Sequence, residues 1–359
     1  MKQFGDVYRS RRVFVTGHTG FKGSWLAAWL IQMGATVTGF ALPPSSTPNH
    51  WDLLQLPVCD LRGDIRDDST VREALQNHKP EIVFHLAAQP LVRHSYREPL
   101  ESWSTNVMGT ANVLEACRGL QGLRAIVIVT TDKVYSDRES SWAYRENDPL
   151  GGHDPYSASK AASELVVKSY RSAFFFRESD PLIATVRAGN VIGGGDWSED
   201  RIIPDVVRAI NRKASLEVRS PEAKRSWQHV LECISAYLLL GQHLMSGRRD
   251  LAQEWNVGPA PDDAWSVLEI LTALKRYWPE LRWHQSDGVQ PHETRLLHLD
   301  SSKARSLLHW RPVWRLDTAL AATAEWYQKL SLTDKPLTME QLSSYLDCAA
   351  KENHSWVAP

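Results

Sequence analysis

Residues 13–23 read VFVTGHTGFKG, and a helical pattern, SWLAAWLIQMG, follows at residues 24–34. Val13 to Thr16 form a short apolar, β-branched run that predicts a strand. Gly17, Gly20 and Gly23 then give the spacing GxxGxxG, which differs from the GxGxxG form. Glycines let a backbone approach a pyrophosphate, and the following helix offers its N-terminal amides and its dipole. The order of strand, glycine turn and helix therefore predicts a dinucleotide site rather than a plain turn.

The second predicted strand, Ala35 to Phe40, ends without the acid that normally bonds the adenosine ribose of NAD, because Gly39 to Ala41 occupy that place. The cation expected beside a 2′-phosphate is missing as well, since no Lys or Arg occurs between Lys22 and Arg62. On balance we expect NAD as the cofactor, and NADP stays as the alternative.

Short strands and helices alternate over the first 190 residues, which is typical of a doubly wound parallel sheet. Glu81 to Gln89 reads as a buried strand that ends in small residues, and these leave room for a cofactor at the sheet edge. We expect an α/β fold: a Rossmann domain over 1–190 with a returning segment near 225–258, and a smaller mixed α/β substrate domain over 191–350. We expect a loop at 43–57, a last helix near 316–330, and a mobile tail beyond about residue 350.

Composition restricts the class of ligand. The 359 residues carry 41 Lys+Arg against 42 Asp+Glu, so charge does not favour nucleic acid or an anionic membrane as a partner. No secretory pattern and no long apolar run occurs, so we expect a soluble, cytoplasmic protein. The four cysteines lie far apart without a CxxC pair, and neither a metal site nor a disulfide framework is indicated. A small molecule is the expected ligand.

Tyr156 and Lys160 lie one helical turn apart in the segment PYSASK, so the phenol and the ammonium share one face. A nearby ammonium favours the phenolate and lowers the pKa of a tyrosine, which lets the pair accept a proton from an alcohol. This spacing is common on helices, and a surface tyrosine beside a solvated lysine is the competing interpretation. The glycine turn upstream favours the catalytic one.

With the glycine turn, the strand that ends in Thr131, and Tyr156 and Lys160 in this order, the chain resembles the extended short-chain dehydrogenase/reductase family over nearly its whole length. More narrowly, TDKVY at 131–135 and RAGNVIGGGDW at 187–197 resemble the nucleotide-sugar 4,6-dehydratases, most closely those that act on CDP-glucose. The resemblance implies oxidation of the hexose at carbon 4, loss of water across carbons 5 and 6, and return of the same hydride to carbon 6, with NAD regenerated. It also implies a place in deoxysugar synthesis for a surface polysaccharide such as lipopolysaccharide.

The resemblance implies a role for each catalytic candidate. Tyr156 is the base at the carbon 4 hydroxyl, Lys160 lowers its pKa and holds the nicotinamide ribose, and Thr131 bonds the same hydroxyl. Asp132 protonates the departing carbon 6 hydroxyl. Lys133 stands where the dTDP-glucose members carry a glutamate, and it either removes the carbon 5 proton or stabilises the enolate as an ammonium.

The binding candidates surround the glycine turn, the strand ends and the C-terminal lobe. For the cofactor they are Gly17, Gly20, Phe21, Lys22, Gly23, Asp64, Ile65, Ala87, Ala88, Asn106, Tyr156 and Lys160. For the substrate they are Asn190, Arg225 and Arg295, since arginine suits bidentate contacts with a diphosphate. Asp64 has a turn or N-cap role as its alternative, and the arginines a surface role.

The resemblance also implies CDP-glucose as the substrate and a homodimer or homotetramer, for which apolar faces on the helices at 106–120 and 156–171 are suitable. Three other functions stay open, and the first is a 4,6-dehydratase that acts on another nucleotide sugar. A nucleotide-sugar 4-epimerase needs only Tyr156, Lys160 and a rotating keto intermediate. A non-catalytic dinucleotide-binding protein needs neither residue, and the presence of both argues against it.

Overall fold

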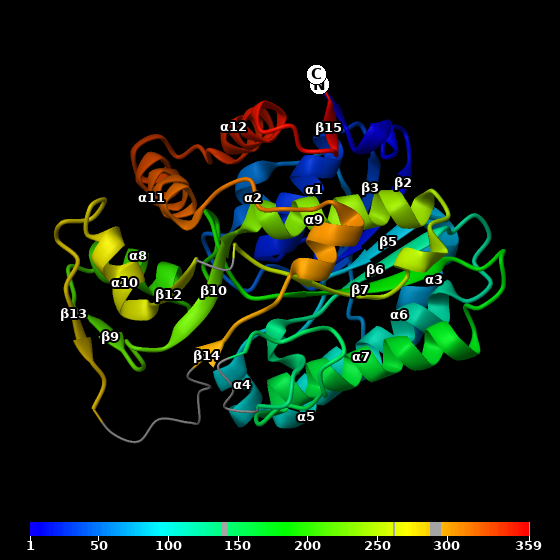
Figure 1. The fold of residues 1–359 in the computed structure, drawn as a ribbon, viewed down its shortest axis with the longest axis horizontal. Helices are drawn as coiled ribbons and strands as arrows, with labels where there is room; N and C mark the ends of the chain where they lie inside the picture. The colour runs from blue at the N-terminus through cyan, green and yellow to red at the C-terminus, as the bar shows by residue number, and fades with distance from the viewer. Residues whose placement is uncertain (138–141, 261–262, 288–295, 359) are drawn as a thin grey trace.

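A central sheet of seven parallel strands organises the computed structural model, which describes residues 1–137, 142–260, 263–287 and 296–358 (Figure 1). The strand order is β11-β7-β6-β5-β2-β3-β4. The strands are β2 (Arg12–Thr16), β3 (Thr36–Ala41), β4 (Cys59–Arg62), β5 (Ile82–His85), β6 (Ala125–Val129), β7 (Leu182–Ala188) and β11 (Glu254–Val257). From β2, the strands β3 and β4 are added on one side, and β5, β6, β7 and β11 on the other. This order confirms the predicted doubly wound α/β fold.

Helices cover both faces of this sheet, which explains why its inner strands are almost entirely apolar. One face packs against α1 (Phe21–Gln32) and α9 (Val230–Met245). The other packs against α3 (Asp68–His78), α6 (Gly109–Cys117) and α7 (Pro155–Ala173). The shorter helices α4 (Val92–Arg97) and α5 (Pro99–Trp103) lie beside α7, and a π-turn at Ser104–Met108 leads into α6. Two hydrophobic cores result, one on each side of the sheet.

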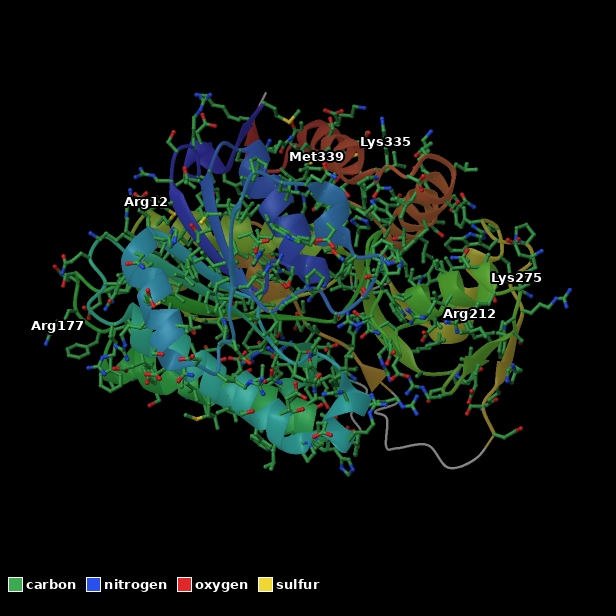
Figure 2. The ribbon with its side chains drawn as sticks, turned by 180° about the vertical axis from the view of Figure 1, so that it is seen from behind. Arg12, Arg177, Arg212, Lys275, Lys335 and Met339 are labelled. Carbon is green, nitrogen blue, oxygen red and sulfur yellow. The ribbon has the colours of Figure 1, made fainter. Side chains whose placement is uncertain are left out.

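A smaller lobe stands beside the carboxyl ends of the strands (Figure 1). Its elements are β8 (Asn190–Ile192), α8 (Ile202–Asn211), β9 (Leu216–Val218), β10 (Lys224–His229), β12 (Ala264–Ser266), α10 (Val267–Leu274), β13 (Trp283–Gln285) and β14 (Leu296–Leu297). Strand β10 pairs with β8, β12 and β14. Seen from behind, Arg212 and Lys275 mark this lobe, and Arg177 lies at the opposite end of the molecule (Figure 2). The domain boundary near residue 190 stays a prediction; α9 and β11 lie with the large sheet, and β10 with the small one.

Two predictions about irregular segments are wrong. The expected loop at 43–57 contains α2 (His50–Leu54), which begins because the Asn49 side chain accepts a hydrogen bond from the Asp52 amide (2.8 Å). The expected mobile tail is ordered: α12 (Thr338–Lys351) follows α11 (Leu316–Thr333), and β15 (Val357–Ala358) pairs with β1 (Lys2–Gln3). The ring of Trp356 stacks on Phe4 with centroids 5.0 Å apart, so apolar burial holds the tail in place.

Among the described helices, none combines the length and the apolar character needed to cross a membrane.

Candidate active site

A cavity of about 1810 Å³ lies where the carboxyl ends of the large sheet meet the smaller lobe. Nearly every site residue predicted from the sequence lines it. These are Gly17, Gly20, Phe21, Lys22, Gly23, Asp64, Ile65, Ala87, Ala88, Thr131, Asp132, Lys133, Tyr156, Lys160, Asn190 and Arg225. Arg295 lies outside the described residues, and Asn106 is not part of the lining. The fold therefore gathers at one place residues that are up to about two hundred positions apart.

The glycine turn packs closely against the end of β5 and leaves the start of α1 open to the cavity. Gly17 has φ +75°, and a Cβ there would lie 2.7 Å from the Ala87 amide nitrogen, so the turn and the end of β5 are almost in contact. Thr16 fixes this approach, because its hydroxyl oxygen accepts the amides of Leu86 and Ala87 (both 3.1 Å). The N-cap of α1 is Gly20, which has no side chain to cap the first-turn amides. These amides fit a dinucleotide pyrophosphate.

Asn106 stands behind the cavity wall and binds protein groups. Its amide nitrogen donates to the Ser159 hydroxyl (2.9 Å) and to the Gln89 carbonyl (3.2 Å), and its side-chain oxygen accepts the Gln89 amide (2.9 Å). The residue is buried, and it fastens α7 to the segment after β5. These hydrogen bonds hold the cavity wall in place, and a direct contact between Asn106 and the cofactor stays a prediction.

The end of β3 carries neither a free acid nor a free cation. Sheet pairing sets Ala41 opposite Arg62, so a guanidinium lies much closer to this strand end than the sequence separation indicates. Arg62 donates to the Leu42 carbonyl (3.3 Å) and to the Asp60 carboxylate (2.6 Å), and is therefore engaged. Asp64 lines the cavity and also closes a turn, because it accepts the Arg66 amide (2.9 Å).

Thr131, Asp132 and Lys133 follow β6 as a short turn on the cavity wall, where Asp132 begins a 3-10 helix (Asp132–Val134). The Thr131 hydroxyl donates to Asp132 Oδ1 (3.0 Å). Asp132 is 2% exposed, and its Oδ2 has no hydrogen-bond partner among the described residues. Burial raises the pKa of Asp132, against the lowering effect of the Lys133 charge beside it. A buried carboxyl with a raised pKa and an oxygen that no described residue bonds is suited to act as an acid.

Gly189, after β7, leaves the space that Asp132 needs. A Cβ at Gly189 would lie 3.3 Å from Asp132 Oδ2 and 2.7 Å from the Ser226 carbonyl oxygen. Because the carbonyl oxygen belongs to the backbone, it has little freedom to move away from such a group. In the motif RAGN (residues 187–190), Gly189 therefore contributes to the site by leaving space for Asp132, and Asn190 contributes a polar side chain to the lining.

Tyr156 enters the cavity from the first turn of α7, which begins at Pro155 and is capped by Asp154, whose side chain accepts the Ser157 amide (2.9 Å). Burial raises the pKa of Tyr156 to about 12, and the hydrogen bond with Thr131 acts in the opposite direction. Thr131 therefore connects the phenol to Asp132.

Lys160 lies on the same face of α7, but its ammonium donates to the Val129 carbonyl (3.1 Å). Burial and the neighbouring charge of Lys22 lower the pKa of Lys160 to about 8. That Lys160 lowers the pKa of Tyr156 stays a prediction.

Sequence reasoning missed part of the polar wall, which comes from α8, from the residues on either side of it and from the segment after β9. Arg201, Arg208, Arg212 and Arg219 line the cavity in addition to Arg225. Arg93 and Asp200, both in the lining, form an ion pair of 2.7 Å between the large sheet's helices and the smaller lobe. None of these residues lies in a motif with fixed spacing, so only their position in the fold identifies them.

Comparison with known proteins gives the same family as the motifs. The model of the GDP-mannose 4,6-dehydratase family matches residues 14–323. A CDP-glucose 4,6-dehydratase of Salmonella typhimurium is 44% identical over 332 residues, which cover 90% of this chain and 92% of that protein. A dTDP-glucose 4,6-dehydratase of Xanthomonas campestris is 27% identical, with 87% and 92% covered.

Solved structures agree with the fold. The epimerase Mth375 of Methanothermobacter thermautotrophicus superposes with a TM-score of 0.81 at 22% identity, and the match covers 91% of this chain and 95% of that one. MoeE5 in complex with UDP-glucose and NAD gives a TM-score of 0.75 at 25% identity, with 90% and 100% covered. The resemblance to the nucleotide-sugar dehydratases is confirmed, and the chain belongs to the GDP-mannose 4,6-dehydratase family.

Proposed function

We propose that this protein is an NAD-dependent CDP-glucose 4,6-dehydratase, which converts CDP-glucose to CDP-4-keto-6-deoxyglucose and water. The observation that carries the proposal is the buried Asp132. Its Oδ1 accepts the Thr131 hydroxyl, which also bonds Tyr156, and its Oδ2 has no hydrogen-bond partner among the described residues. A 4-epimerase needs the tyrosine and the lysine but has no use for an acid at carbon 6. The 44% identity to the Salmonella enzyme supports CDP-glucose over other nucleotide sugars.

NAD fits the cavity at the glycine turn. The uncapped first turn of α1 would take the pyrophosphate, and Lys160 would bond the nicotinamide ribose. The missing Cβ of Gly17 lets the turn lie against the end of β5 at Ala87, which also lines the cavity. Bound there, NAD would supply the hydride chemistry of the reaction, first as an acceptor at carbon 4 of the sugar and then as a donor at carbon 6. The end of β3 offers no carboxylate to the adenosine ribose, so the turn and the α1 amides supply most of the recognition there.

The chain's own residues move the protons. Tyr156 removes the proton of the carbon 4 hydroxyl while Thr131 holds that oxygen by a hydrogen bond. The resulting ketone makes the carbon 5 proton acidic. Asp132 then gives its proton to the carbon 6 hydroxyl, which departs as water. Lys133, half-buried on the same turn, is placed either to take the carbon 5 proton or to stabilise the enolate as a cation.

The proposal is tested by incubating the purified protein with CDP-glucose and with NAD. We expect a product lighter by one water and no net formation of NADH, as followed by mass spectrometry and absorbance. An isomer of unchanged mass would indicate a 4-epimerase. Parallel reactions with dTDP-, GDP- and UDP-glucose test the base preference. Binding of NAD with no turnover of any of the four would leave a dinucleotide-binding protein and refute the proposal.

We further propose that the enzyme is a homodimer joined through α5, α7 and the π-turn. The apolar faces predicted for this role, including Val113 and Leu114, are buried in the protein's own core. On α5, α7 and the π-turn, the exposed apolar side chains instead include Leu100 (81%), Met108 (56%), Leu165 (56%) and Trp103 (40%). Because α5 and the π-turn lie against α7, these side chains supply a different apolar surface from the one predicted.

Replacing Leu165 and Leu100 by aspartate is expected to convert the dimer to a monomer, since charges at the centre of an apolar interface are costly to bury. Sedimentation velocity measures the change directly. Leu332→Asp on α11 is the matched control, because Leu332 is also 81% exposed but lies on a helix that packs against β10, β8 and α10 of the smaller lobe. A monomer before any substitution, or an unchanged dimer in the double variant, would rule out this interface.

A further inference from the structure

A buried ion pair between Glu164 on α7 and Arg187 on β7 lies next to the turn that carries Asp132. Glu164 is 3% exposed and lies one helical turn after Lys160. Its two oxygens accept two hydrogen bonds from Arg187 on β7, from Nε and from Nη2 (both 3.0 Å). Such a bidentate pair fixes both side chains in orientation as well as in distance.

The same pair holds the catalytic turn from both sides. On the N-terminal side, the Thr130 hydroxyl donates to Glu164 Oε1 (2.6 Å). On the C-terminal side, Arg187 Nη1 donates to the Tyr135 hydroxyl (2.9 Å), with the guanidinium carbon 5.0 Å from the centre of the Tyr135 ring. Thr131, Asp132 and Lys133 are the first three of the four residues between these two attachment points. We call Thr130, Glu164, Arg187 and Tyr135 the clamp.

The clamp joins the two elements that carry the proposed catalytic residues, namely α7 and the turn after β6. Glu164 belongs to the helix that carries Tyr156 and Lys160, and Thr130 and Tyr135 flank the turn with Asp132. Tyr135 is further fixed, because its hydroxyl donates to Asn256 Oδ1 on β11 (2.6 Å). A shift of the turn relative to α7 therefore has to break a buried hydrogen bond. Thr130 and Tyr135 line the cavity beside the turn, whereas Glu164 and Arg187 lie behind that lining.

We propose that Glu164 is a positioning residue, which through Thr130, Arg187 and Tyr135 sets the distance between the acid Asp132 and the base Tyr156. This inference rests on the proposed function. The two proton transfers occur at carbons 4 and 6 of one sugar, so the acid and the base have to be held at a fixed separation. Small displacements of a reacting group are costly: about one ångström can cost about a hundred-fold in rate.

The test compares two threonines that bond the same carboxylate. Thr130→Val removes the hydroxyl that ties the turn to Glu164. Thr185→Val removes the equally buried hydroxyl that donates to Glu164 Oε2 (2.8 Å) from β7, and it does not adjoin the turn. We expect Thr130→Val to lower kcat at least about ten-fold with KM changed by less than about two-fold, and Thr185→Val to leave both within about two-fold. Thr130→Ser, which keeps a hydroxyl, should restore the rate.

A second measurement does not depend on turnover. Amide hydrogen exchange over residues 131–135 in the purified protein should accelerate in Thr130→Val and in Tyr135→Phe, and should stay unchanged in Thr185→Val. Equal effects of Thr130→Val and Thr185→Val on both rate and exchange would show that Glu164 serves only general stability and would overturn the inference. If wild-type protein fails with every nucleotide-glucose while exchange follows the expected pattern, the proposed function fails and the clamp stands as a structural feature.

Discussion

Asp132→Asn is expected to let the oxidation at carbon 4 proceed while the loss of water slows by about a hundred-fold to ten-thousand-fold, the usual contribution of a general acid. The amide keeps the shape of the side chain and its contact with Thr131, but it has no proton of suitable acidity to give to the carbon 6 hydroxyl. The reduced cofactor should therefore accumulate on the enzyme, and stopped-flow absorbance at the wavelength of reduced nicotinamide measures it.

Asp196→Asn is the matched control for this experiment, because Asp196 is also a buried acid of the cavity (3% exposed) but caps the Ser198 amide and pairs with Arg201. It is expected to weaken substrate binding without any build-up of reduced cofactor. If Asp132→Asn instead slows oxidation and elimination to the same extent, Asp132 orients the substrate and another group is the acid.

Tyr156→Phe is expected to abolish the first step, with a loss of about a hundred-fold to ten-thousand-fold in the rate of oxidation and no change in NAD affinity. Burial raises the pKa of Tyr156 to about 12, so a base with this pKa gains activity as the pH rises and more of it loses its proton. The rise of the wild-type oxidation rate with pH should disappear in the variant. Single-turnover rates across pH and a separate titration with NAD measure the two effects.

Tyr96→Phe serves as the comparison, since Tyr96 lines the same cavity from α4 and has no place in the proposed mechanism. Its rate and pH dependence should match those of the wild type. Oxidation that survives in Tyr156→Phe at more than a tenth of the wild-type rate would require a different base.

Much of the fold follows from local patterns. The glycine turn after β2, the small residues after β5 and the Tyr156 helix each depend on neighbours within a few residues, and the sequence predicts them. The polar wall of Arg93, Arg201 and Asp200 depends on how the two lobes meet, and the spacing of residues along the chain does not predict that arrangement. The order of the C-terminal tail cannot be predicted from the sequence for the same reason. Trp356 packs against Phe4, which comes from the other end of the chain.

The pKa values of buried groups are harder to predict from the sequence than contacts are. The effect of burial on a pKa can be larger than that of one neighbouring charge, and burial depends on the whole fold. From spacing alone, Lys160 should draw down the pKa of Tyr156. In the structure, desolvation raises the pKa of the phenol, and the Lys160 ammonium bonds a backbone carbonyl. Asn106 shows the related limit for hydrogen bonds: a motif identifies a polar residue, but only the fold shows whether ligand or protein takes up its donors.

Helix α7 presents two stripes with different neighbours. Tyr156, Lys160 and Glu164 face the interior, while Leu165, with 56% of its surface exposed, faces outward. Because the stripes share no positions, substitutions on the outer one can be chosen without altering the inner one. A designer could therefore recode the outward stripe so that two different variants pair as a heterodimer, and leave the arrangement of the interior groups as it is.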